Sequence, residues 1–138
     1  MSKRRLAREY SLQTLYIAEA ASMSVSEATL YVNNFFDNLE KDTFPFCKDL
    51  VNGTLNYQKK IDKILGSYAN NWSVDRMSSV DRCILRMATY EIVFSPDQAP
   101  IPAIIDEAIE LSKKYSTDKS GKFINGLLDR IKAERKNG

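Results

Sequence analysis

Residues 79–94 read SVDRCILRMATYEIVF, a stretch in which apolar side chains return at every third or fourth position. This spacing predicts an amphipathic α-helix rather than a strand. Its core face carries five small or apolar residues: Val80, Cys83, Ile84, Met87 and Ala88. A second face is expected to carry Arg82, Arg86 and Tyr90. Glu91 continues the core face, and because a buried carboxylate is costly without a partner, we expect it to make a buried structural bond.

The rest of the chain shows the same helical spacing. Its 138 residues include only five glycines and four prolines, and alternating β-branched runs are absent, so we predict an all-α fold. Turn-forming residues separate predicted helices at about residues 3–21, 24–37, 43–68, 79–94, 102–115 and 118–131. Pro102 fits the first turn of its helix, and Asp, Ser or Thr near 118–120 can cap the last one. We expect a single compact domain over residues 1–138, with about six to seven helices.

Two of these helices carry more specific expectations. The first places Leu6, Tyr10 and Ile17 on one side and its three arginines on the other, so its arginine end is expected to project from the protein. In the last helix, Gly126 occupies an interior position. Because glycine there costs about 1 kcal/mol relative to alanine, we expect another backbone to pack closely against it.

The composition argues against catalysis and metal binding. The chain contains no histidine, and its two cysteines, Cys47 and Cys83, lie far apart without a CxxC spacing. Phosphate-binding glycine loops and nucleophile–base pairs are also absent from the sequence, so we expect no enzyme and no cofactor. Both cysteines are predicted to be reduced core thiols. Since no signal peptide or membrane-spanning run is present, we expect a cytosolic protein.

Positive charge is concentrated at the two ends of the chain. Residues 1–22 carry four basic and two acidic groups and residues 118–138 carry six and three, although the whole chain has a net charge of only +2. The basic residues form three groups: Arg4, Arg5 and Arg8; Arg82 and Arg86; Lys119 and Lys122. Single-stranded RNA is held by such cations together with aromatic rings on which bases stack, here Tyr16, Tyr90 or Phe123. Spacing alone leaves two alternatives open, because an arginine run can simply be solvated and Phe123 can be a core residue.

Four blocks of the sequence resemble the NusB family, in the same order and in a chain of the same total length. The opening block is RRLARE at residues 4–9, followed by Gln13 and by Leu15-Tyr16. The central block is the helix at residues 80–91. The last two blocks are DEA at 106–108 with Glu110, Leu111 and Lys113, and KFING at 122–126 with Leu128 and Asp129. The resemblance spans essentially the whole chain.

The resemblance implies an all-α fold of two helical subdomains that binds the boxA segment of nascent RNA. It implies binding together with NusE, a small-subunit ribosomal protein, in a complex that makes RNA polymerase resist termination on ribosomal RNA operons. Carried over by position, the RNA-binding residues would be Arg4, Arg5, Arg8, Gln13, Tyr16, Arg86, Phe123 and Asn125. The charge pattern adds Arg82, Lys119 and Lys122. The ribosomal protein would contact Tyr16 and Asp81.

Other functions remain open at this stage. A helical adaptor that binds only proteins could use the Trp72 loop and an acidic helix face formed by Asp106, Glu107 and Glu110. Similar modules also precede methyltransferase domains that act on ribosomal RNA, although a chain of this length is expected to lack one. Homodimerisation is a further possibility, through apolar residues near Phe35, Phe36 or Phe44.

Overall fold

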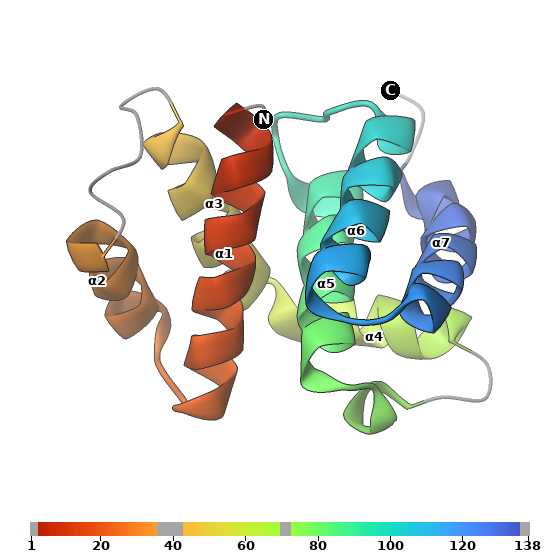
Figure 1. Ribbon diagram of the computed structural model, residues 1–138, viewed down its shortest axis with the longest axis horizontal. Helices are drawn as coiled ribbons and strands as arrows, with labels where there is room; N and C mark the ends of the chain where they lie inside the picture. The colour runs from red at the N-terminus through yellow and green to blue at the C-terminus, as the bar shows by residue number, and fades with distance from the viewer. Residues whose placement is uncertain (1–2, 36–42, 70–72, 136–138) are drawn as a thin grey trace. The chain divides into compact units, whose positions relative to one another are not determined.

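A computed structural model describes residues 3–35, 43–69 and 73–135 of the chain (Figure 1). These residues form α-helices and short 3-10 and π segments, and the described part contains no strand, so the predicted all-α class is confirmed. The α-helices are α1 (Lys3–Ala20), α2 (Val25–Phe35), α3 (Phe44–Asn56), α4 (Gln58–Tyr68), α5 (Ser79–Thr89), α6 (Ile101–Tyr115) and α7 (Asp118–Ile131). The shorter segments are η1 (Val74–Arg76), η2 (Tyr90–Phe94) and η3 (Lys132–Glu134). None of the described helices is long and apolar enough to cross a membrane.

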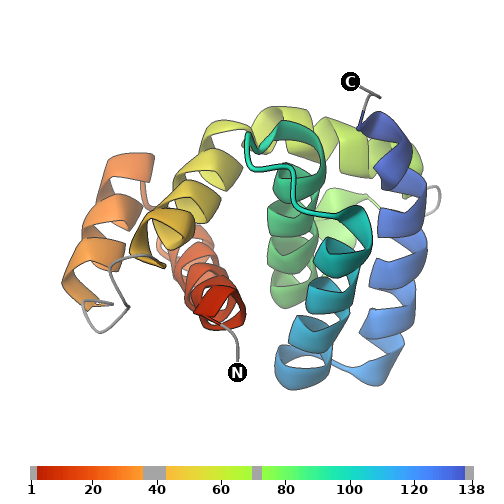
Figure 2. The same cartoon turned by 90° about the horizontal axis from the view of Figure 1, so that it is seen from above.

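The chain divides into two compact units, Met1–Asn56 and Tyr57–Gly138. In the first unit, α3 packs against both α1 and α2. In the second, α5 contacts α4, α6 and α7, and α6 packs along α7, as Figure 2 shows. The expectation of one domain over the whole chain stays a prediction, whereas the helical character of each unit agrees with the predicted fold class.

The buried face of α1 differs from the predicted one. Leu6 was expected to point inward but is 36% exposed. The buried positions of α1 include Ala7, Ser11, Leu15 and Ala18, which follow one another at helical spacing. Small side chains on this face allow α3 to approach, and the Ser11 hydroxyl lies 3.2 Å from the thiol of Cys47 on that helix. A hydrophobicity pattern gives such small residues little weight, which is why the prediction was wrong.

Neither cysteine forms a disulfide and both are buried, as the sequence predicted. Burial raises the pKa of the Cys47 thiol, and the hydrogen bond with Ser11 offsets only part of that rise. Because the thiolate is the reactive form of cysteine, this thiol is expected to be inert in the folded protein.

The start of α2 is held by a reciprocal pair of hydrogen bonds. The backbone N–H of Glu27 donates to the hydroxyl of Ser24 at 3.1 Å, and the Ser24 N–H donates to the Glu27 carboxylate at 3.1 Å. This capping box satisfies two backbone donors that the first helical turn leaves without partners. The hydrogen bond from the Ser24 backbone also lowers the pKa of the Glu27 carboxyl.

The single helix predicted over residues 43–68 is two helices, α3 and α4. Tyr57 breaks it with non-helical backbone angles, φ −99° and ψ 9°. The apolar stripe continues through the break, so the sequence pattern did not reveal it. The Tyr57 ring stacks on Phe94 with the ring centroids 4.5 Å apart, which helps fix the position at which the second unit begins.

The stretch at residues 79–94 forms α5 and then widens into the π-helical η2. The helix begins as predicted, with the Ser78 hydroxyl accepting a hydrogen bond from the backbone N–H of Asp81. The predicted burial of Glu91 is confirmed, since it is only 3% exposed. Tyr90 is also 3% exposed, so it cannot serve as a stacking platform for RNA bases. It lies seven residues after Cys83, and two helical turns bring it back to the core face.

The junction between α6 and α7 is tight. Pro102 lies in the first turn of α6, as predicted, and the Thr117 hydroxyl caps α7 by accepting a hydrogen bond from Ser120 N–H. The close backbone approach predicted at Gly126 is not found, whereas side chains of α6 come close to Gly121. A Cβ atom on Gly121 would lie 3.2 Å from the Ser112 hydroxyl, whereas one on Gly126 would meet no described atom within 4 Å.

Candidate nucleic-acid interface

The arginine cluster at the start of α1 consists of Arg4, Arg5 and Arg8. Arg4 is exposed, Arg5 is half-buried, and Arg8 is only 6% exposed, so the prediction that all three project into solvent was wrong for Arg8. The guanidinium carbons of Arg4 and Arg8 lie 4.3 and 5.2 Å from the ring centroid of Phe46 on α3. Both distances are within the range of cation–π contacts. The aromatic partner thus comes from another helix of the same unit, and sequence spacing did not indicate it.

The other two candidates in the first unit lie further along α1. Tyr16 is 45% exposed, which is high for a large aromatic residue. Gln13 is half-buried one turn earlier. An exposed tyrosine presents an apolar ring and a polar hydroxyl, a combination that suits contacts with a protein partner or with a base.

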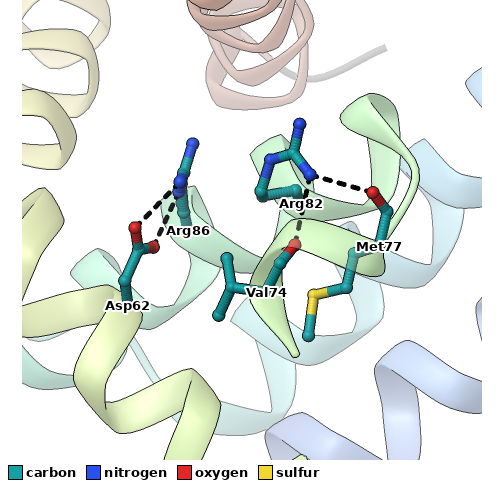
Figure 3. A network of polar contacts seen from close by, with 5 residues as sticks. All are labelled: Asp62, Val74, Met77, Arg82 and Arg86. Carbon is teal, nitrogen blue, oxygen red and sulfur yellow. Dashed lines mark hydrogen bonds and ion pairs between the residues drawn. The ribbon is translucent and has the colours of Figure 1, made fainter. Parts of the chain in front are cut away.

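The two arginines of α5 make bonds within the second unit (Figure 3). Arg86 forms a two-point ion pair with Asp62 of α4, in which Nε and Nη2 each donate to one carboxylate oxygen at 2.8 Å. Arg82 Nη1 donates to the backbone carbonyl oxygens of Val74 at 3.1 Å and Met77 at 2.9 Å. Both guanidinium groups therefore support the fold around α5, in addition to any contact with RNA.

A pocket of about 430 Å³ lies in the second unit, between the start of α5 and the start of α7. Its lining brings together three residues that the sequence singled out, Asp81, Lys119 and Phe123. The remaining lining residues are Arg76, Met77, Ser78, Thr117 and Ser120. The wall of the pocket carries cations, an aromatic ring and hydroxyl groups. These groups can bind the phosphate, base and sugar of one unstacked nucleotide.

The Asp81 carboxylate is held in this pocket by two serine hydroxyls. Ser116 donates to one carboxylate oxygen and Ser120 to the other, each at 2.8 Å. These bonds tie the first turn of α5 to the junction between α6 and α7. Asp81 is therefore a fixed acceptor at the pocket wall.

Lys122 and Asn125 do not line the pocket. Both are exposed on α7, where they face solvent beside the pocket-lining residues of the same helix. Arg76 of η1 does line the pocket and was not selected from the sequence. Its helix is only three residues long, so no periodic pattern indicated which way its side chain points.

Sequence similarity shows the family of the chain. A sequence profile of the NusB family matches residues 5–133. The chain belongs to the NusB family. It is 54% identical to the transcription antitermination protein NusB of Elusimicrobium minutum, covering 100% of this chain and 99% of that protein. It is 40% identical to the NusB protein of Bacillus subtilis, covering 96% of each.

Solved NusB structures share the fold. The structure of NusB from T. maritima matches with a TM-score of 0.86 and 36% identity, covering 96% of this chain and 92% of that one. A structure of the antitermination factors NusB and NusE in complex with double-stranded RNA matches with a TM-score of 0.85 and 28% identity. That match covers 96% of this chain and 98% of the other. The resemblance seen in the sequence is thereby confirmed.

Proposed function

We propose that this NusB-family protein is a non-enzymatic transcription antitermination factor of the cytosol. It binds boxA-type single-stranded RNA together with the ribosomal protein NusE and, within the RNA polymerase antitermination complex, promotes processive transcription of ribosomal RNA operons. The observation that carries the RNA-binding part is the pocket in the second unit, where Lys119 and Phe123 face the same space.

In this proposal, both units supply phosphate contacts, and the second unit also supplies the contacts to a base. The arginine cluster of α1 and the exposed lysines of α7 bind phosphates, which fix the position of the strand without reading its sequence. Phe123 stacks an unpaired base in the pocket, and the fixed carboxylate of Asp81 accepts hydrogen bonds from base or protein donors. Asn125, with its amide donors and acceptor, contacts the strand beside the pocket.

The ribosomal protein is proposed to contact Tyr16 and Asp81. The exposed ring of Tyr16 is available for burial against a partner, and such aromatic residues are enriched in protein interfaces. If RNA and partner touch each other when both are bound near Asp81, each is expected to increase the affinity of the protein for the other by the same factor.

A protein-only adaptor is the second candidate function. It is supported by the acidic face of α6, where Asp106 and Glu110 are exposed and Glu107 is half-buried, as predicted. The Trp72 loop of this hypothesis lies outside the described residues. The homodimer hypothesis named Phe36 and Phe35, and Phe36 and the side chain of Phe35 also lie outside them. Phe44 is half-buried.

The test is a fluorescence-anisotropy titration of a boxA-like RNA, a scrambled RNA and a double-stranded RNA, each with and without NusE and at two salt concentrations. Sequence-selective binding that tightens with NusE supports the proposal. Absence of RNA binding with and without NusE, while a separate titration of labelled NusE shows that NusE still binds the protein, supports the protein-only adaptor. Light scattering on the same samples detects a homodimer that prevents binding.

Two variants connect this test to the pocket. Lys119→Ala removes one phosphate-binding charge and should lower the slope of log affinity against log salt by about one unit. Phe123→Leu should weaken binding by about 1–3 kcal/mol through the loss of base stacking. The matched control is Lys113→Ala on α6, an exposed lysine paired with Glu110 at 3.4 Å, which should leave RNA affinity unchanged.

A further inference from the structure

Arg82 fixes a short helical segment at the wall of the pocket. Its Nη1 donates to the carbonyl oxygens of Val74 at 3.1 Å and Met77 at 2.9 Å, at the start of η1 and just after its end (Figure 3). Its Nη2 donates to the Ser79 hydroxyl, in the first turn of α5, at 3.4 Å. We propose that Arg76 of η1 binds an RNA phosphate at the pocket, and that Arg82 is the positioning residue that holds η1 in place for it. This inference rests on the proposed function.

The segment η1 is too short to be stable by itself. It is a single turn of three residues, closed by backbone hydrogen bonds from Arg76 N–H to Ser73 at 3.0 Å and from Met77 N–H to Val74 at 3.2 Å. So few bonds do not offset the entropy lost when the backbone of one turn is fixed. The Arg82 guanidinium joins the two ends of this turn, and hydrogen bonds from a charged donor are stronger than neutral ones. Arg82 therefore determines where the residues of η1 lie.

Arg76 adds a second cation to the pocket. It is exposed at the end of η1 and lines the pocket, as does the exposed Lys119 from the first turn of α7. The carboxylate of Asp81 belongs to the same lining, where it accepts hydrogen bonds from two serine hydroxyls. The described lining thus carries two cations against one carboxylate, a balance that attracts phosphate. A guanidinium can bind phosphate through two parallel N–H···O bonds, which the point charge of Lys119 does not supply.

The substitution Arg82→Lys separates a direct contact of Arg82 with RNA from an effect through η1. It keeps the positive charge, but an ammonium on a flexible chain does not reproduce the planar fork that reaches two carbonyl oxygens. If the charge of Arg82 binds a phosphate directly, this variant should bind RNA almost as well as the wild type. If Arg82 acts by holding η1, RNA affinity should fall although no charge is lost.

The experiment is a double-mutant cycle of Arg76→Ala and Arg82→Lys, in which affinity for the boxA-like RNA is measured at several salt concentrations. Arg76→Ala should weaken binding about fivefold, which corresponds to about 1 kcal/mol for one exposed ion contact. It should also lower the magnitude of the slope of log affinity against log salt by about one unit. Arg82→Lys should weaken binding about threefold, because RNA must then order the segment itself. The double variant should bind like Arg76→Ala, since no cation is left on η1 for Arg82 to position.

Two controls separate this effect from a general loss of structure. Arg130→Ala removes an exposed arginine of α7 that does not belong to the pocket lining, and it should leave RNA affinity and the salt slope unchanged. Urea unfolding of each variant verifies that the protein is folded during the titrations. Hydrogen exchange of the Met77 amide should become faster in Arg82→Lys, whereas that of Leu85 within α5 should not. Arg82→Gln, whose side-chain amide can still donate to one carbonyl, replaces Arg82→Lys in the cycle if that variant does not fold.

The possible failures are distinguishable. Beside a wild type that binds RNA, unchanged affinity in Arg76→Ala overturns the phosphate contact. Wild-type affinity in Arg82→Lys, unchanged exchange at Met77, or effects that multiply in the double variant overturn the positioning role of Arg82. Absence of RNA binding by the wild type overturns the proposed function, and with it this inference.

Discussion

Removal of the Arg86 guanidinium tests whether its ion pair with Asp62 stabilises the second unit. The two side chains are only 11% and 29% exposed, and two donor–acceptor distances of 2.8 Å join them. Truncating one partner of a fully buried pair costs about 3–5 kcal/mol, whereas exposed pairs contribute about 0–1 kcal/mol. For this partly buried pair we expect Arg86→Ala to lower the free energy of unfolding by about 2 kcal/mol.

The assay is equilibrium unfolding in urea of the wild type, Arg86→Ala, Asp62→Ala and the double variant. With a denaturant slope of about 2 kcal/mol per molar, the midpoint of Arg86→Ala should shift by about 1 M. The four stabilities form a double-mutant cycle, in which we expect a coupling energy of about 1–2 kcal/mol. A coupling energy below about 0.5 kcal/mol would show that the pair contributes no more than an exposed one and does not stabilise the second unit.

RNA titrations with the same variants separate the two roles of Arg86. The protein should remain folded after a loss of about 2 kcal/mol, because domains are typically stable by about 5–15 kcal/mol. If Arg86 also binds RNA, Arg86→Ala weakens binding, whereas Asp62→Ala releases the guanidinium and preserves or raises affinity. Unchanged affinity in Arg86→Ala would count against Arg86 as an RNA-binding residue.

Three further outcomes follow from the geometry. Ser24→Ala removes one half of the capping box and should lower the free energy of unfolding by about 1 kcal/mol, measured in urea. Gly126→Ala should raise the free energy of unfolding by about 0.5–1 kcal/mol, because the added methyl group lies in open space. Gly121→Ala should give no such gain, because its methyl group would crowd Ser112. Because the pKa of the Cys47 thiol is raised, little of it is present as thiolate at pH 8. A thiol reagent should therefore label Cys47 only after the protein unfolds. Rapid labelling of the native protein would contradict the burial of this thiol.

The helical class was readable from the sequence because it depends on local spacing. The periodic apolar face of residues 79–94 predicted both the start of α5 and the burial of Glu91. The first turn of α6, with Pro102, followed equally from local chemistry. The break between α3 and α4 at Tyr57 could not be predicted in this way, because the apolar stripe continues on both sides of it. The feature that distinguishes Tyr57 is its packing against Phe94, which is distant along the chain.

The chemical character of the candidate site was also present in the sequence. Arginines at one end, lysines and Phe123 at the other, and the four blocks of family resemblance all indicated an RNA-binding protein. Their arrangement was not readable. The sequence did not select Phe46 or Arg76, and it assigned Tyr90 to the wrong face.

The sequence alone was enough to establish the helical class, the chemical groups available and the family. Which of these groups meet depends on how the chain folds, because the contacts concerned join residues that are distant along the chain. Arg86 and its carboxylate partner are 24 positions apart, and Asp81 and the two serines that hold it are 35 and 39 positions apart. A helical pattern reports what lies on one face of one helix, whereas these contacts depend on how the helices of each unit pack against each other.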